Sequence, residues 1–165
     1  MRICSLASGS RGNSIFIESN DSRILIDAGL SALKIKTSLS SIGIEPNSID
    51  AIVITHAHRD HVNGAGIFSH QFKTPIWAHP DTLDRLSYLF NRNQNINPWL
   101  GNFRIKDLIL EPFAVSHDAT PTVGYQIKSN NKTIVVCTDL GMVSSEVENN
   151  LSEANLLVIE SNHDP

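Results

Sequence analysis

The first thirty residues alternate short apolar runs with turn-forming residues. Positions 2–7 and 14–18 have strand-like patterns on either side of a Gly/Ser-rich turn, and positions 23–26 follow the turn signal Asn20-Asp21-Ser22. This pattern predicts three strands in a β meander. Asp27 ends the third strand and precedes Ala28-Gly29, where the glycine allows a tight backbone turn.

From residue 30 onward the pattern indicates helices alternating with strands. Buried strands are expected at 51–54 and 75–78, because both are short apolar runs. Helices are expected from about residue 30 to Gly43, from Val62 to Phe72, and from Pro80 onward. Apolar residues of the first helix fall roughly at helical spacing: Leu33, Ile35, Leu39 and Ile42. The second helix carries Ile67 and Phe68, and in the third Leu83, Leu86, Leu89 and Phe90 make a core face. This is the order of a β-α-β fold.

The segment 91–102 is rich in asparagine and contains Pro98 and Gly101, which predicts a long, mobile loop. Trp99 within it either forms part of a substrate wall or packs as an anchor of the loop. Three strands are expected to follow at 109–115, 122–128 and 133–137. A short helix at 144–150 and a last strand at 156–159 complete the predicted elements.

Composition limits the class of protein. The 165 residues, 41% of them hydrophobic, suffice for one buried core, so a single domain is expected. No apolar run is long enough to cross a bilayer and the start of the chain lacks a secretion signal, so we expect a cytoplasmic protein. Cys4 and Cys137 fit small core residues better than a disulfide. The net charge of −4 argues against binding nucleic acid by bulk electrostatics, and Lys34 and Lys36 fit the solvated side of a helix.

Four residues of metal-ligating type stand within six positions directly after the strand 51–54: His56, His58, Asp60 and His61. Imidazole nitrogens and ionised carboxylates are ligands for ions such as Zn²⁺ and Fe²⁺. In α/β folds, sites form on the loops at the carboxyl ends of strands. His56 and His58 can bind one ion, and Asp60 and His61 can turn toward a second. The alternative is a polar loop that happens to be rich in histidine. His70, inside the second helix, and His79, after the strand 75–78, are expected to be ordinary surface or packing histidines.

Positions 56–61, His-Ala-His-Arg-Asp-His, match the HxHxDH signature of the metallo-β-lactamase-fold hydrolases. Five further segments are similar to the bacterial YycJ/WalJ branch of that family: SGSRGNS at 8–14, LIDAG at 25–29, VSHD at 115–118, CTDLG at 137–141 and ESNHD at 160–164. The resemblance covers essentially the whole chain. It implies an αββα sandwich of the α/β (α+β) class and a single domain over residues 1–165 that lacks part of its C-terminal half.

The resemblance also implies a ligand set for two Zn²⁺ ions, with Mn²⁺ or Fe²⁺ as other candidates. His56, His58 and His117 would hold the first metal, Asp60 and His61 the second, and Asp139 would bridge both. Taken alone, His117 and Asp139 would equally fit a loop histidine and an aspartate that caps a turn. Asp27 is implied to lie beneath the HxHxDH loop and to orient it; a helix cap is the alternative from the residues alone.

One ligand of the family pattern has no counterpart, because members usually carry a final histidine on the second metal in a region beyond this length. His163 belongs to the segment 160–164 instead. It either lies near the second metal or is only a polar residue at a strand end. The second metal site is therefore expected to be weaker than the first.

The implied activity is hydrolysis of DNA phosphodiesters by a hydroxide that bridges the two metals, with Asp60 and Asp139 as catalytic carboxylates. The same hydroxide can attack a carbonyl carbon, so a thioester, lactone or lactam hydrolase is an alternative. A second alternative is a catalytically silent metal-binding or interaction module. Uncovered sheet surface would favour a homo-oligomer in that case. No membrane partner is expected.

Overall fold

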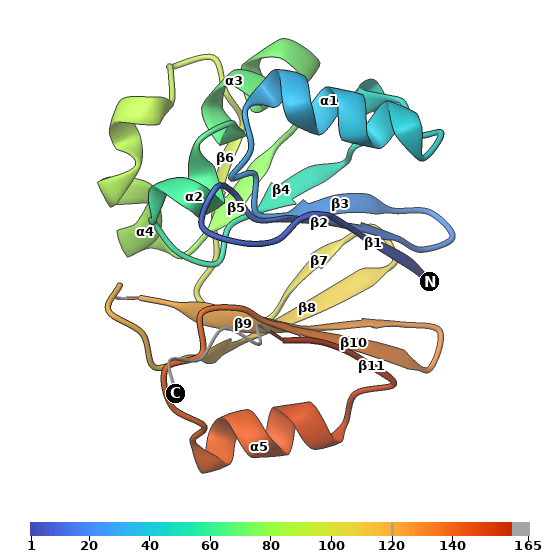
Figure 1. Ribbon diagram of the computed structural model, residues 1–165, viewed down its shortest axis with the longest axis vertical. Coiled ribbons are helices and arrows are strands. Elements are labelled where there is room, and N and C mark those ends of the chain that lie inside the picture. The colour runs from blue at the N-terminus through green and yellow to red at the C-terminus, as the bar shows by residue number, and fades with distance from the viewer. Residues whose placement is uncertain (120, 160–165) are drawn as a thin grey trace.

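The computed structural model describes residues 1–119 and 121–159, and these residues form four layers. Two β-sheets pack face to face in the middle (Figure 1). Helices α1, α2, α3 and α4 cover the outer face of the first sheet, and α5 covers the outer face of the second. This arrangement confirms the predicted αββα sandwich.

The first sheet has six strands in sequence order: β1 (Arg2–Ala7), β2 (Ser14–Glu18), β3 (Arg23–Ile26), β4 (Ala51–Val53), β5 (Ile76–Ala78) and β6 (Ile96–Pro98). The first three strands pair antiparallel, as predicted for the meander. The strands β3 to β6 pair parallel, with helical connections between them. Because parallel strands point the same way, β3 and β4 end at the same rim of the sheet.

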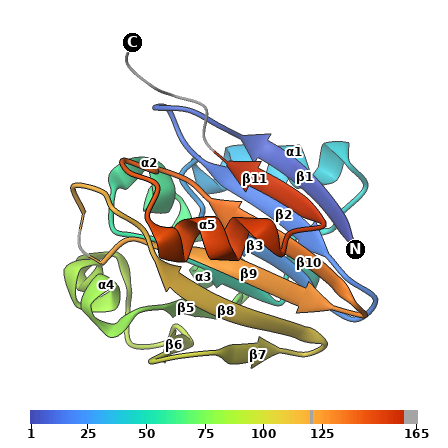
Figure 2. The ribbon, with the colours of Figure 1, turned by 90° about the horizontal axis from the view of Figure 1, so that it is seen from below.

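The second sheet has five strands in the order β11-β10-β9-β8-β7: β7 (Phe103–Ile105), β8 (Leu108–Ala114), β9 (Val123–Ser129), β10 (Lys132–Cys137) and β11 (Leu156–Ile159). Pairing is antiparallel from β7 to β10 and parallel between β10 and β11. Both β8 and β10 run antiparallel to β9, so their carboxyl ends lie at one rim. Figure 2 shows the edge strands β1 and β11 on the same side of the sandwich.

The helices are short and several have side-chain caps. They are α1 (Ala32–Ser41), α2 (Arg59–Val62), α3 (Ala65–Phe72), α4 (Pro80–Arg85) and α5 (Ser145–Ser152), with 3₁₀ turns at Pro46–Ser48 and Ser87–Leu89. Ser31 and Ser144 each accept a hydrogen bond from the backbone N–H three residues later. Within the described residues, every helix is too short or too polar to pass through a membrane.

Strand alternation divides the apolar residues between two cores. Phe16 and Leu25 point toward the helices on the outer face of the first sheet, whereas their neighbours Ile15, Ile17 and Ile24 point between the sheets. A third, smaller core lies between the second sheet and α5. Because side chains alternate along β2 and β3, these strands contribute to the core under the helices and to the core between the sheets.

Two sequence predictions about these elements need correction. The predicted helix 62–72 begins only at Ala65, as α3, and Val62 instead ends the short helix α2; between them Gly64 lies so close to the Leu30 carbonyl that a Cβ would be 2.2 Å from its oxygen. The predicted loop 91–102 contains β6, which pairs with β5, and its Trp99 is buried. Leu33 of α1 and Ile67 of α3 are apolar residues on the solvent side of their helices, 72% and 66% exposed. The strand β7 was not predicted.

Candidate metal centre

Polar side chains from both sheets meet at one rim of the sandwich. His56 and His58 follow β4, His117 follows β8, and Asp139 follows β10. Each of these strands ends at this rim, which is why residues far apart in sequence come together. Asp60 and His61 join them from the short helix α2.

The first group of ligand-type atoms consists of His56, His58 and His117, with one ring nitrogen of each within 4.8 Å of the others. Nε2 of His117 lies 3.2 Å from Nδ1 of His58. The ring of His56 meets the other two nearly edge-on, with centroid distances of 4.7 and 5.2 Å. The imidazoles therefore converge on a common point instead of stacking.

The second group shares His56 and adds His61 and Asp139 within the same 4.8 Å limit. Nε2 of His61 lies 2.9 Å from Oδ2 of Asp139. Asp60 is more peripheral: its Oδ2 is 3.7 Å from Nε2 of His61, and its side chain is 33% exposed. Both groups are thus brought together by the fold, with His56 between them.

Asp27 supports the centre from a buried position at the end of β3. Its Oδ1 accepts from the Thr55 N–H at 2.8 Å, and its Oδ2 accepts from the Thr55 hydroxyl at 2.8 Å and lies 2.7 Å from Nδ1 of His61. Thr55 Oγ1 is in turn 3.0 Å from Nδ1 of His56. With Nδ1 of His56 and His61 bound in this way, Nε2 of both rings points to the rim.

Burial and neighbouring charges set the protonation of the centre. Burial, together with His61, lowers the pKa of His56 to about 4, so its ring is neutral at pH 7. Burial raises the pKa of Asp139, but the hydrogen bond from His61 and its charge outweigh burial and lower the pKa to about 2. Burial lowers the pKa of His61, but Asp27 and Asp139 raise it to about 10. The two carboxylates thus favour a positive charge on the His61 ring.

The donor set fits a divalent metal ion. Nε2 of His56 is buried and has no hydrogen-bond partner among the described residues, although an unpartnered buried nitrogen is costly. An ion bound by this lone pair would remove that cost. Neutral imidazoles with an ionised carboxylate are the ligands that Zn²⁺ and similar ions prefer. The centre therefore suits divalent metal binding.

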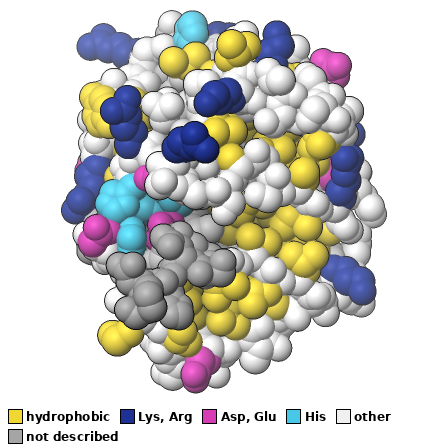
Figure 3. Space-filling model, viewed as in Figure 1, with side chains coloured by type: hydrophobic (Ala, Val, Ile, Leu, Met, Phe, Trp, Pro, Cys, Tyr) yellow, Lys and Arg dark blue, Asp and Glu magenta, His cyan; other side chains and the backbone are white. Residues whose placement is uncertain are grey.

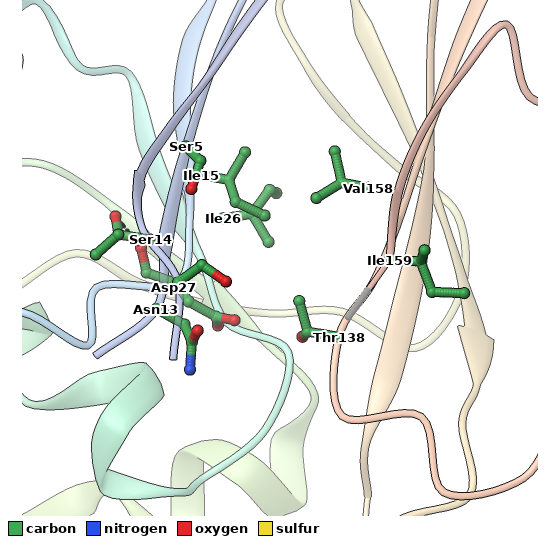
Figure 4. Close-up of a pocket in the computed structure, with 11 residues that line it drawn as sticks. Ser5, Asn13, Ser14, Ile15, Ile26, Asp27, Thr138, Val158 and Ile159 are labelled. Carbon is green, nitrogen blue, oxygen red and sulfur yellow. Dashed lines mark hydrogen bonds between the residues drawn. The ribbon is translucent and has the colours of Figure 1, made fainter. Parts of the chain in front are cut away.

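A small cavity of about 40 Å³ adjoins the centre between the two sheets. Figure 4 shows Asn13 and Asp27 on one side of it and Thr138 on the other. A space of this size holds a few water molecules at most, because each needs roughly 10–15 Å³ of such volume. A substrate must therefore approach the centre from the outer side of the rim.

Three residues at the centre are absent from the predicted site: Asn13, Thr55 and Asp118. Asn13 Nδ2 lies 2.9 Å from Nε2 of His61 and donates to Oδ2 of Asp60 at 3.2 Å. Asp118 Oδ1 lies 2.9 Å from Nε2 of His117. Asn13 and Asp118 lie in the segments 8–14 and 115–118 that carry the resemblance. These segments were the sequence feature from which both residues could have been predicted. His163 lies outside the described residues.

A known protein family matches most of this chain. The Beta-lactamase superfamily domain matches residues 22–164. The chain belongs to this family. Its fold agrees: the Rm3 metallo-beta-lactamase superposes with a TM-score of 0.71 at 18% identity, covering 95% of this chain and 74% of that one. At that identity the likeness concerns the fold alone.

Two proteins with known names are more similar to this chain in sequence. Exodeoxyribonuclease WalJ of Streptococcus pneumoniae serotype 2 is 35% identical over 165 residues, and Exodeoxyribonuclease YycJ of Bacillus anthracis is 32% identical over 163 residues. Each alignment covers 96% of this chain but only 61% and 62% of the relatives. The chain thus spans about three fifths of their length. The similarity supports the predicted YycJ/WalJ-like character.

Proposed function

We propose that this chain carries the metal centre of an exodeoxyribonuclease that hydrolyses DNA phosphodiesters. The observation that carries the proposal is the pair of adjacent ligand groups sharing His56 at an open rim. The relatives named as exodeoxyribonucleases support DNA as the substrate class. Both the activity and the substrate are proposals here, because the chain spans only part of those relatives.

The proposed cofactor is a pair of Zn²⁺ ions. His56, His58 and His117 would hold the first, as predicted, and His61 and Asp139 the second. Asp60 would complete the second site from the exposed side, and Asp139 would bridge both. Support comes from the neutral state of His56 and the ionised state of Asp139 at pH 7, since these are the ligating forms.

Bound divalent ions would supply positive charge to the phosphoryl oxygens and lower the pKa of an attacking water. The chain's own residues prepare the site. Asp27 and Thr55 fix the rings of His56 and His61, so that their outer nitrogens stay directed to the rim. The negative charge of Asp139 is held by its low pKa, about 2, across the whole neutral range.

The test compares the chain with two variants on end-labelled single- and double-stranded DNA, with Zn²⁺ or Mn²⁺ added. His58→Ala removes one nitrogen of the first group and is expected to lower the rate at least about 100-fold. His70→Ala changes an exposed histidine of α3 and should leave the rate unchanged. Elemental analysis of the same samples should find two zinc ions per wild-type chain and fewer in His58→Ala.

Products that shorten from a strand end would identify an exonuclease, as proposed. Equal cleavage by wild type and His58→Ala, or no cleavage with either metal, would overturn the proposal. Hydrolysis of a thioester or lactone panel in place of DNA would favour the alternative substrate class.

A further inference from the structure

The loop between β1 and β2 is attached directly to the metal centre. The backbone N–H of Asn13 donates to the Asp60 carbonyl at 2.7 Å, and the Asn13 carbonyl accepts from the Gly29 N–H at 2.8 Å. The Asn13 side chain adds a hydrogen bond to Oδ2 of Asp60. The loop therefore has a fixed position relative to a predicted metal ligand.

Residues 8–12 of this loop form a tight turn with exposed polar groups. Gly9 and Gly12 have φ values of 128° and 142°, and the Gly12 N–H donates to the Gly9 carbonyl at 2.9 Å. Among the described residues, the hydroxyls of Ser8 and Ser10 and the backbone N–H groups of Ser10 and Arg11 have no hydrogen-bond partner. Outward-facing N–H groups in such a turn can bind an anion.

Three exposed cations surround this turn: Arg11 in the loop, Lys34 on α1 and Arg59 at the start of α2. Within residues 1–119 and 121–159, none of the three forms an ion pair, whereas Arg23, Lys106 and Lys128 each do. Figure 3 shows Lys and Arg side chains on the same face as the histidine cluster. The positive charge beside the centre is therefore available to a ligand.

Two neighbouring hollows extend from these cations to Asp60, a predicted metal ligand. The first, of about 540 Å³, is lined by the turn together with Lys34. The second, of about 260 Å³, lies between Arg11, Arg59 and Asp60. Ser10 and Arg11 line both. A strand lying along the hollows would thus pass from Lys34 to Asp60.

The walls of the hollows indicate what they bind. Apart from the Asp60 carboxylate, the polar groups of the walls are hydroxyls, N–H groups, an amide and cations, which suit phosphate, and none of the residues lining either hollow is aromatic. The chain as a whole has a net charge of −4, so this basic strip is local. We propose that the 8–12 loop, with Arg11 and Lys34, binds a backbone phosphate of the DNA strand that leads to the metal centre. The inference rests on the proposed nuclease function and adds a substrate-binding site to it. Lys34 is exposed on α1, as predicted for the solvated side of a helix, and the inference adds phosphate binding to that position.

The experiment measures binding separately from cleavage. Fluorescence anisotropy follows a labelled single-stranded oligonucleotide in EDTA, over a range of salt concentrations. Arg11→Gln/Lys34→Gln is compared with Lys36→Gln/Arg85→Gln, which removes the same two charge types from exposed positions outside the hollows. The first variant should bind roughly tenfold more weakly, with a salt slope smaller by about 0.7 per lost cation. The control should match wild type.

A second probe with an uncharged methylphosphonate backbone tests phosphate recognition. The difference between the two variants should disappear with it, and a difference that persists would contradict the inference. In the cleavage assay with metal, Arg11→Gln/Lys34→Gln should raise KM and leave kcat unchanged, because the lost contact is the same in ground and transition states.

The two proposals fail in different ways. If wild type does not cleave DNA but the binding difference is present, the nuclease proposal fails and the phosphate site stands. If wild type cleaves DNA while the two double variants bind alike, the phosphate site is wrong and the nuclease proposal stands.

Discussion

At the scale of single residues, Asp27 is buried at the end of β3 and contacts both Thr55 and His61. It has φ of 61°, an unusual value for a residue other than glycine, and Asp139 has φ of 55°. This backbone turn at the end of β3 points the Asp27 carboxylate at Thr55 and His61. Two carboxylate oxygens thus fix the orientation of two imidazoles through direct and relayed hydrogen bonds.

Asp27→Asn should weaken metal binding by roughly 10- to 100-fold. The amide has one acceptor oxygen where the carboxylate has two, so either the Thr55 N–H on Oδ1, or the Thr55 hydroxyl and Nδ1 of His61 on Oδ2, lose their acceptor. Competition with a zinc chelator measures the affinity. Asp21→Asn, at an exposed turn, is the control; equal affinities in the two variants would show that Asp27 does not position the ligands.

At the scale of elements, the connection between β3 and α1 is packed against the segment that carries His56 to His61. The Ala28 N–H donates to the His61 carbonyl at 2.8 Å, and the Gly64 N–H donates to the Ala28 carbonyl at 2.8 Å. Gly29 sits where the two segments cross. The sequence suggested that its role is a tight turn, but the structure gives a different reason, which is the close approach of Asp60.

Gly29→Ala should destabilise the fold by about 3 kcal/mol and weaken metal binding. A Cβ at this position would lie 1.5 Å from the Asp60 carbonyl oxygen and 2.6 Å from the Asn13 nitrogen, and both are backbone atoms. Thermal unfolding measures the effect. Gly101→Ala is the matched control, since its Cβ would meet nothing within 4 Å. An unfolding temperature equal to that of the control would contradict the steric argument.

At the scale of the whole molecule, the two sheets are linked by hydrogen bonds at both ends. At the rim with the centre, the buried Tyr125 hydroxyl donates to the Ile54 carbonyl at 2.7 Å. At the opposite end, Asp107 accepts from Ser19 and Ser22 of the first sheet at 2.6 Å each, and from Ser129 of the second at 3.0 Å. These contacts hold the relative position of the sheets on which the shared site depends.

Stability should therefore fall in acid through Asp107. Burial raises the pKa of Asp107, but the hydrogen bonds from Ser19, Ser22 and Ser129 lower it to about 2, from 3.8. The unfolded chain thus binds this proton more tightly. The contribution is complete above about pH 4 and is lost as the pH falls toward 2.

Asp107→Asn should cost about 1–3 kcal/mol at pH 7 and should flatten the decline in free energy of unfolding between pH 4 and 2. Urea unfolding across this range measures it. Asp84→Asn, an exposed carboxylate on α4, serves as the control. If Asp107→Asn and the control decline in parallel with wild type, the linkage is wrong.

The sequence by itself determined the elements whose signal is local. Period-two alternation fixed β2 and β3, and the density of ligand types marked His56 to His61, because neighbours along the chain carry that information. The resemblance over segments 25–29, 115–118 and 137–141 pointed to Asp27, His117 and Asp139. Their roles as ligands or supports stay predictions, although the fold brings them together.

Only the tertiary structure decided the rest, because it depends on contacts between segments distant in sequence. β6 is a strand only through pairing with β5, and α2 ends where Gly64 must pass the Leu30 carbonyl. Asn13 contacts Asp60, 47 residues later in the chain. The turn pattern predicted the loop that contains Asn13 but not the residue it contacts. Lys34 and Arg11 line one hollow because α1 packs beside that loop, a juxtaposition that no local pattern encodes.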